Sequence, residues 1–364
     1  MTGWDVAVVG GGLAGAAAAC RLAEAGRRVV LLERTPGPHH KVCGEFVSGE
    51  AELSLQELGL GGALRRLGGV PVERVRLAAG RITATVALPF PATGLSRRRL
   101  DGWLLRAAAR RGVAVCAGQP VRGMGRDGAG VRLLTSDEPV RADAVLLATG
   151  KHDLRGAPRQ GRPSTLIGLK LHLRLAPEAA RALAGAVELT LFEGGYAGLQ
   201  AVEGGVANLC LVVEKDRFAA LERDWCRLVA AVPYLERRLD GASACWSDPL
   251  AVYRIPYGYL HRADEAAAGP VYRLGDQLAV IPSFTGDGMA MALRSATQAA
   301  AAVLAGLPPA VYHRRMVKAF TPQVRLAGAV AGLGAIAALQ APLVAACRAL
   351  PNLLTTMAAR TRSP

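Results

Sequence analysis

Two apolar runs near the N-terminus flank a longer Ala-rich stretch. The runs cover Asp5–Val9 and Arg28–Glu33, and the stretch covers residues 13–25 and is closed by Gly26. Apolar runs of this length favour buried strands, whereas a longer apolar stretch that ends at a glycine favours a helix. The chain therefore begins with a predicted strand–helix–strand unit.

Similar patterns continue to Gly150 and change after it. Up to Gly150 they predict helices over residues 48–58 and 96–110, and strands over residues 72–78, 82–88, 113–117, 130–135 and 144–147. Beyond Gly150, apolar and polar residues alternate in residues 168–175, 187–192, 197–202, 207–213 and 251–255, which predicts an antiparallel sheet. Helices are predicted over residues 217–232 and 233–239, followed by a strand over 271–274 and a long Ala-rich helix to residue 304.

A glycine motif joins the first predicted strand to the first helix. Gly10, Gly12 and Gly15 have the spacing G-x-G-x-x-G, and Glu33 ends the second strand. In a dinucleotide site these glycines make a tight turn, let the backbone approach a pyrophosphate and let the helix pack on the strand, while the terminal acid binds ribose hydroxyls. The predicted cofactor contacts in this part of the chain are Gly10, Gly12, Leu13, Ala14, Gly15, Glu33 and Arg34.

A second motif lies far along the chain and favours FAD as the dinucleotide. Residues 272–276 form a predicted strand that ends in Gly275 and Asp276, and a glycine loop over residues 282–289 opens a helix. The Asp276 carboxylate can accept from a ribityl hydroxyl, and the helix N-terminus can stabilise an anionic reduced flavin. The predicted contacts of this loop are Pro282, Gly286, Asp287, Gly288 and Met289, and an ordinary turn before a helix is the alternative explanation.

These motifs, together with residues 146–150 (LLATG), resemble the FAD-dependent p-hydroxybenzoate hydroxylase superfamily over residues 4–310. Within it, residues 41–45 (KVCGE) resemble the branch that includes the geranylgeranyl reductases. The resemblance implies that Arg97, in a helix similar to the superfamily's R-x-x-L-D helix, contacts the cofactor. It further implies that Lys41, Val42, Cys43, Val121, Thr149 and Gly150 lie at the flavin cofactor.

Two positions depart from the pattern of the superfamily. Thr149 stands where the hydroxylases carry an aspartate before Gly150, and Gln277 and Leu278 replace an Ala-His pair. The aspartate is linked with the handling of NAD(P)H, so the expected electron donor is either NAD(P)H or a separate donor.

The predicted fold is therefore α/β, with a Rossmann-like FAD-binding domain, an inserted antiparallel-sheet substrate domain and a helical C-terminal tail. The FAD-binding domain is expected to combine residues 1–70, 96–160 and 268–310. The substrate domain is expected to combine residues 71–95 and 161–267, and residues 311–364 form the apolar helical tail.

Three residues are candidates for catalysis. Cys43, beside the flavin by resemblance, could donate a proton or only pack. His172 shares one face of its predicted strand with Lys170 and Arg174, opposite four leucines. That face either presents His172 to a substrate or meets solvent, and we favour solvent. Tyr196 could bind a substrate through its hydroxyl or pack at a strand end.

Composition narrows the range of partners. The formal net charge of the 364 residues is +15, and 39 of the 44 basic residues are scattered arginines. This favours a compositional bias, an anionic membrane or an anionic ligand, and no nucleic-acid partner is expected. The seven cysteines form no CxxC pair, which favours reduced thiols in a cytoplasmic protein and no metal site.

The tail contains an uncharged run over residues 326–347, bracketed by Arg325 and Arg348. The run is long enough to span a bilayer, but it is mostly Ala and Gly and contains Gln340 and Pro342. Three interpretations are open: packing on the core, peripheral contact with a membrane surface, and a true span.

The leading hypothesis for function is a single-component FAD monooxygenase that hydroxylates an apolar aromatic or polyketide-like small molecule. The alternative is a flavin-dependent reductase of prenyl or other carbon–carbon double bonds, favoured by residues 41–44 and by the apolar tail. A non-catalytic flavin-binding protein is a third class. The sequence contains no nucleophile elbow, HExxH helix, Walker loop or W-x-W-x-I-P motif of the flavin-dependent halogenases.

Overall fold

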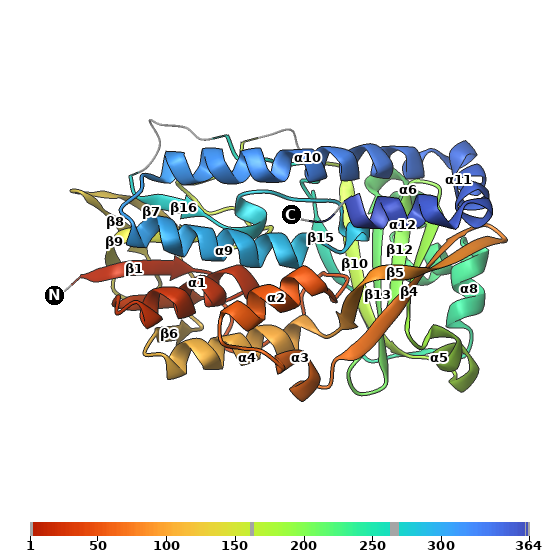
Figure 1. Ribbon diagram of the computed structural model, residues 1–364, viewed down its shortest axis with the longest axis horizontal. Coiled ribbons are helices and arrows are strands. Elements are labelled where there is room, and N and C mark those ends of the chain that lie inside the picture. Colours follow the sequence, from red (N-terminus) through yellow and green to blue (C-terminus); the bar gives the residue numbers. More distant parts are fainter. Residues whose placement is uncertain (1–2, 161–163, 263–268, 361, 363–364) are drawn as a thin grey trace.

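Two mixed β-sheets and the helices around them make up the protein, whose computed structural model describes residues 3–160, 164–262, 269–360 and 362. The molecule is elongated, with one sheet toward each end, and α10 (Pro309–Ala335) runs along the side of both (Figure 1). This arrangement confirms the predicted α/β class with its helical C-terminal region.

The first sheet contains the predicted strand–helix–strand unit. Its strands follow the order β6 (Ala114–Ala117), β2 (Val29–Glu33), β1 (Trp4–Val9), β9 (Val140–Leu147), β8 (Gly130–Leu134) and β7 (Gly123–Asp127), and β16 (Val271–Arg273) also pairs with β9. β1 runs parallel to β2 and β9, which brings their carboxyl ends to one edge of the sheet. An apolar core joins this sheet to α1 (Leu13–Glu24), α4 (Arg97–Arg110) and α9 (Gly288–Leu304).

The second sheet forms the other end of the molecule. Its order is β14 (Ser243–Ala244), β10 (Leu166–Arg174), β13 (Val206–Glu214), β12 (Gly195–Val202), β11 (Ala186–Phe192), β4 (Val70–Ala79), β5 (Ile82–Gly94) and β3 (Phe46–Ser48), with β15 (Leu250–Tyr253) beside β10. The antiparallel prediction is correct for these pairs except β11 and β4, which run parallel. Strand β3 was not predicted, because three residues give too short a pattern. The division of the chain into three domains stays a prediction.

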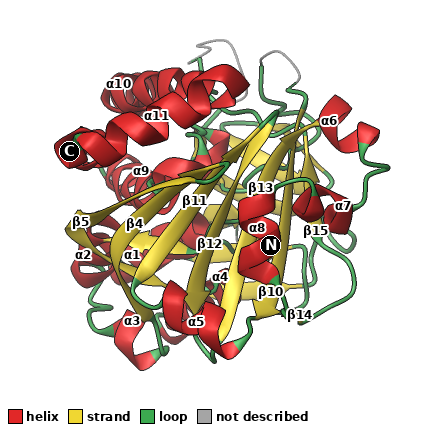
Figure 2. Cartoon of the chain, turned by 90° about the vertical axis from the view of Figure 1, so that its right-hand side faces the viewer, coloured by secondary structure: helices red, strands yellow, loops and turns green. Residues whose placement is uncertain are grey.

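The two faces of the second sheet have different neighbours. Figure 2 shows α5 (Pro177–Leu183), α6 (Lys215–Ala220), α7 (Trp225–Ala230) and α8 (Pro233–Leu239) on one side of the second sheet. The leucines of β10 pack in an apolar core with these helices. At Lys170 and His172 the opposite face of β10 does not meet solvent, since these residues are 0% and 5% exposed. The solvent interpretation is therefore wrong for these two residues and correct for Arg174, which is exposed.

The helices of the second half depart from the prediction in two places. The single helix expected over residues 217–232 is divided into α6 and α7, because Glu222 and Arg223 take positive φ values of 57° and 58° that a helix cannot contain. The helix α5 was not predicted. The helices α2 (Gly49–Glu57) and α3 (Ala63–Arg66) follow β3 and lead to β4.

The tail folds back over the second sheet. α10 is followed by α11 (Ala337–Ala349) and α12 (Pro351–Arg360), and Val344 and Cys347 of α11 pack with the apolar side chains of β4, β5 and β11. In the part of the chain that the structure describes, no single helix is long and apolar enough to span a membrane. α10 and α11 meet that criterion only as a pair bent by 111°.

We expect Gly15→Ala to lower the free energy of unfolding by about 1–3 kcal/mol, the usual cost of overpacking. A methyl group there would lie 2.0 Å from the carbonyl oxygen of Gly10 and 3.1 Å from Cγ1 of Val8, so α1 would have to move away from β1. Urea unfolding measures the change. Gly37→Ala is the control, because its methyl group meets no atom within 4 Å. Equal midpoints for the two variants would contradict the close packing of α1 on β1.

Candidate active site

A cavity of about 500 Å³ lies where the carboxyl edge of the first sheet meets the second sheet. Most of the residues predicted to hold the cofactor line it: Gly10, Gly12, Leu13, Ala14, Glu33, Arg34, Lys41, Val42, Cys43, Arg97, Val121, Thr149, Gly150, Asp276, Gly286, Gly288 and Met289. Segments that lie far apart in the sequence thus come together around one cavity.

The glycine turn forms one end of the cavity. Gly10 has a φ of +107°, and a methyl group on it would lie 2.4 Å from the carbonyl oxygen of Ala148. α1 begins at Leu13 with neither a side-chain cap nor an acidic residue in its first turn. Its first N–H groups therefore face the cavity without a side-chain acceptor, which is the geometry that binds phosphate.

Glu33 is held firmly at the end of β2. Its Oε2 accepts from the N–H of Gly11 at 2.7 Å, and its Oε1 accepts from the N–H and hydroxyl of Thr35 at 3.0 and 2.8 Å. Burial alone would raise the pKa of this carboxyl, but the hydrogen bonds of Thr35 and Gly11 and the charge of Lys41 lower it below its usual value. Glu33 is thus a fixed carboxylate beside the glycine turn.

A second fixed carboxylate, Asp101, aims Arg97 and Lys41 at the same region. Nε and Nη2 of Arg97 donate to the two oxygens of Asp101 at 2.9 and 3.0 Å, and Nζ of Lys41 donates to Oδ2 at 2.8 Å. Burial opposes ionisation of Asp101, but the charges of Arg97 and Lys41 hold its pKa below the usual value. The resemblance assigned Arg97 to the cofactor, and the structure adds Asp101 as the group that orients it.

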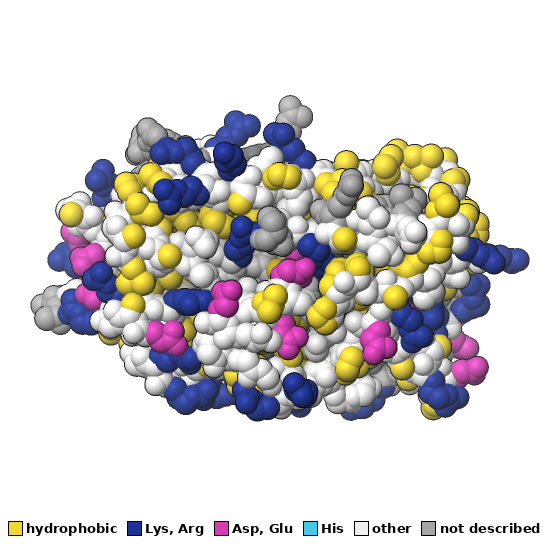
Figure 3. Space-filling model, in the orientation of Figure 1, with side chains coloured by type: hydrophobic (Ala, Val, Ile, Leu, Met, Phe, Trp, Pro, Cys, Tyr) yellow, Lys and Arg dark blue, Asp and Glu magenta, His cyan; other side chains and the backbone are white. Residues whose placement is uncertain are grey.

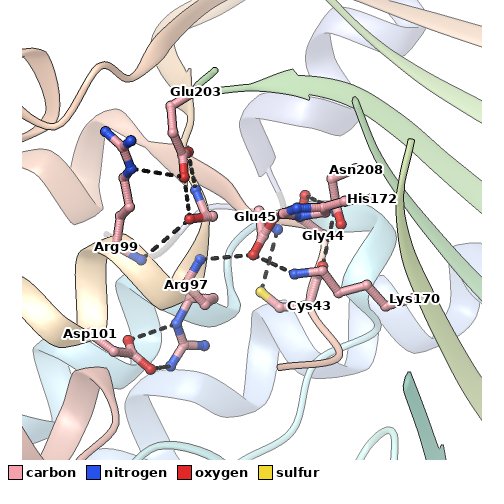
Figure 4. Close-up of polar contacts among 11 residues, drawn as sticks. Cys43, Gly44, Glu45, Arg97, Arg99, Asp101, Lys170, His172, Glu203 and Asn208 are labelled. Atoms are coloured by element: carbon pink, nitrogen blue, oxygen red, sulfur yellow. Dashed lines mark hydrogen bonds and ion pairs between the residues drawn. The ribbon is translucent and has the colours of Figure 1, made fainter. Parts of the chain in front are cut away.

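Glu45 is the centre of a buried charged cluster that the sequence did not reveal (Figure 4). Its side chain is 0% exposed, Nζ of Lys170 donates to its Oε1, and Nε2 of His172 lies 2.7 Å from its Oε2. The N–H of Arg97 also donates to Oε1, at 2.8 Å. Burial would raise the pKa of Glu45, but the His172 hydrogen bond and the Lys170 charge lower it, so the carboxylate stays ionised.

The loop that carries Cys43 is fixed by this cluster. The N–H of Glu45 lies 3.4 Å from Sγ of Cys43, and Nδ2 of Asn208 donates to the carbonyl oxygens of Cys43 and Gly44 at 3.1 and 2.9 Å. The backbone of Glu45 has a φ of +59°, which is uncommon for a residue other than glycine. The second sheet, through Lys170 and Asn208, therefore sets the position of a thiol that lines the cavity.

His40 lies against the same cluster. Its ring centroid is 4.7 Å from that of His172 and 4.9 Å from that of Trp246. Burial and the charge of Lys170 lower the pKa of His40 to about 4, so its ring is neutral at neutral pH. His40, Glu45 and His172 have metal-ligand chemistry, but the Lys170 ammonium occupies the carboxylate where a cation would bind.

Three hydroxyl side chains form a second polar cluster beside the cavity. Tyr257 and Ser283 line the cavity, and their oxygens lie 2.7 Å apart. Tyr196 does not line it, but its hydroxyl lies 2.5 Å from Oγ of Ser283. Nearby, Nζ of Lys151 donates to Oδ2 of Asp276 at 3.0 Å, and this pairing raises the pKa of Lys151.

Five predicted site residues lie outside the cavity lining. Gly15 packs α1 on β1, and Pro282 is buried at the start of its loop. Asp287 turns away, toward the tail, where it accepts from Nε2 of Gln323 at 2.9 Å. His172 and Tyr196 do not line the cavity, but they contact the lining residues Glu45 and Ser283, respectively.

The main site residue that sequence reasoning missed is Glu45. It stands in the KVCGE segment but not in a strand or helix, so no periodic pattern marked it. The buried face of β10 was the available signal, because a lysine on a strand flanked by leucines needs an acidic partner if it is buried.

The N-terminal part of the chain is similar to known proteins. Residues 3–144 match the family described as "FAD binding domain". A menaquinone reductase of Mycolicibacterium smegmatis is 33% identical over 153 residues, which make up 40% of this chain and 34% of that protein. A menaquinone reductase of Mycobacterium tuberculosis is 46% identical over 57 residues, 16% of this chain and 14% of that protein. The similarity thus spans about a third of these relatives or less.

Solved structures resemble the whole chain. The flavin-dependent brominase Bmp2 superposes with a TM-score of 0.80 at 17% identity and covers 100% of this chain and 95% of its own. A geranylgeranyl bacteriochlorophyll reductase-like protein of Thermoplasma acidophilum superposes with a TM-score of 0.78 at 19% identity, covering 99% and 97%. At these identities the likeness establishes a shared fold.

We expect Glu45→Gln to lower the free energy of unfolding by about 3–5 kcal/mol, because it leaves the Lys170 ammonium buried without a counter-charge. Urea unfolding at neutral pH measures the loss. Glu24→Gln is the matched control: its ion pair with Arg111 is at the surface, and we expect a change within about 1 kcal/mol. Equal losses in the two variants would contradict the role of Glu45.

Glu45 also predicts a pH dependence of stability. Its folded pKa lies below the unfolded value of about 4.3, so its stabilisation is complete above that pH and is lost as the pH falls through the folded pKa. Urea unfolding between about pH 6 and pH 3 should therefore show a shallower acid dependence for Glu45→Gln than for the unmodified protein. Parallel curves would contradict a lowered pKa at Glu45.

Proposed function

We propose, from the match of residues 3–144 to the FAD binding domain family, that the protein is an FAD-dependent oxidoreductase. The residues at the cavity fit this cofactor. The uncapped start of α1 and the turn at Gly10 suit the pyrophosphate, the fixed Glu33 suits a ribose, and Asp276 suits the ribityl chain.

The reaction we propose is reduction of a carbon–carbon double bond in an apolar substrate of prenyl or quinone type. The observation that carries this proposal is the Cys43 thiol, a proton-bearing group held at the cavity wall by the Glu45 and Asn208 contacts. Bound FAD, once reduced, supplies a hydride to one carbon of the double bond. The other carbon needs a proton, and the cavity lining offers Cys43 as its donor.

The surrounding residues support proton donation by Cys43. Arg97 and Lys151 line the same cavity as the thiol, so two cations lie at the cavity wall. Val42, Val212 and Ile255 also line the cavity and exclude water from an apolar substrate. The names of the matched relatives, both menaquinone reductases, support a reductase over the monooxygenase that leads from sequence alone.

The monooxygenase remains the second candidate, and one observation favours it. The hydroxyls of Tyr257 and Ser283 lie side by side at the cavity, where they could bind the oxygen of a phenolic substrate. Such a substrate would be positioned by two hydrogen bonds before oxygen transfer.

Anaerobic turnover separates the two candidates. The FAD-loaded protein is reduced with dithionite or NADPH and mixed with a prenylated quinol, whose head group is already reduced, and the product is analysed by mass spectrometry. We expect a gain of two carbon-bound hydrogens without oxygen. After reduction with dithionite in D2O both are deuterium, because the N5 hydrogen of reduced flavin and the thiol hydrogen exchange with solvent. A product that forms only in air and contains one added oxygen would overturn the reductase proposal in favour of the monooxygenase.

Cys43→Ala tests the proton donor. We expect the turnover rate to fall by about 100-fold or more, as for loss of a general acid, with the FAD content unchanged. The matched control is Cys226→Ala, which removes an exposed thiol on α7 and should leave turnover unchanged. Full turnover by Cys43→Ala would contradict the proposal and show that another group donates the proton.

A further inference from the structure

The turn between α10 and α11 exposes a continuous apolar surface. We call residues 332–339 the elbow; residues 332, 333 and 335–339 are all exposed, and none of the eight is charged. Leu333 is 51% exposed, Ile336 49% and Leu339 40%. Exposed runs of this kind normally mark an interaction surface, because they cost solubility without adding to the core.

Hydrogen bonds and buried side chains hold the elbow in place on the second sheet. Nε2 of Gln340 donates to the carbonyl oxygens of Phe192 and Gly334, both at 2.9 Å. Val344 and Cys347, one and two turns further along α11, are 0% exposed against the second sheet. The inner side of the bend is therefore fixed on β11 while its outer side is left apolar and uncovered by the described residues.

The charge of the C-terminal part is of one sign. Residues 288–364 contain eight basic residues and no acidic residue. Lys318 and Arg325 of α10 are exposed and line a groove of about 710 Å³, to which Arg262 also contributes. The spacing of Lys318, Thr321, Arg325 and Gly328 places them on one face of the helix, and the same face continues to the elbow.

Basic and apolar side chains thus follow one another along one side of the molecule. Figure 3 shows dark blue side chains over the first half of α10, along the upper edge, and yellow side chains gathered at the end that carries α11. A cationic strip beside an exposed apolar bend matches the two layers of an anionic membrane surface, its phosphate headgroups and its acyl chains.

We propose that the elbow and the groove dock the protein on an anionic phospholipid bilayer. Ile336, Leu339 and Leu333 enter the boundary of the acyl chains, and Lys318 and Arg325 contact headgroup phosphates. A second copy of the chain is the less suitable occupant. A two-fold contact through this surface would bring the same cationic strip of both copies together.

Sedimentation with vesicles tests this docking. The FAD-loaded full chain is mixed with vesicles of phosphatidylcholine alone or with added phosphatidylglycerol. We expect binding only to the vesicles with phosphatidylglycerol, weakening as salt is raised. The double variant Lys318→Gln/Arg325→Gln should lower the partition coefficient about 25-fold. The double variant Ile336→Asn/Leu339→Asn should lower it about tenfold.

Matched controls are Arg110→Gln/Arg132→Gln and Leu134→Asn, which change exposed residues on α4 and β8. We expect both controls to bind as the unmodified protein does, with FAD content equal in all variants. The proposal is overturned if the unmodified protein ignores anionic vesicles, if its binding is insensitive to salt, or if the controls lose as much as the docking variants. A dimer in light scattering that dissociates on Ile336→Asn/Leu339→Asn, without a loss of vesicle binding, would assign the face to a second copy.

Discussion

The buried ion pair between Glu45 and Lys170 is the interaction on which the rest of the site depends. Glu45 follows the loop of Cys43, and Lys170 lies on β10, so the pair fixes this loop on the second sheet. Removing both charges from water is costly, and the pair is stable only with its further hydrogen bonds, from His172 and the N–H of Arg97. The position of the thiol and the start of α4 therefore depend on one carboxylate.

The nucleotide end of the cavity could be predicted from the sequence, and the substrate end could not. Gly10 and Glu33 belong to a motif whose local geometry is nearly fixed by its residues, so their positions follow from the spacing. The alternation of β10 correctly placed Lys170 and His172 on one face. It could not say what covers that face, because the covering residue is Glu45, 125 residues earlier. The alternation of apolar and polar residues shows which side chains share a face of a strand, but it does not show which other residues pack against that face.

The tail shows the same limit at the level of helices. Composition identified residues 326–347 as apolar, but an apolar run alone does not distinguish a core helix from a surface helix. Because α10 and α11 meet at a bend of 111°, some residues of the run are buried and others are exposed. Val344 is buried against the second sheet, whereas Ile336 is exposed at the bend. The sequence left packing on the core and contact with a membrane surface as alternatives. In the structure one pair of helices contains both a face packed on the core and an exposed apolar surface.

The sequence separation of Glu45 and Lys170 has a consequence for how the chain folds. A contact between residues 125 positions apart can form only after the intervening loop has closed, and long-range contacts of this kind form slowly. Until then each charge keeps its hydration, and the loop of Cys43 has no fixed place. The loop of Cys43 therefore takes its place only once β10 has reached Glu45, and a chain whose second sheet is still unformed has no fixed position for the thiol.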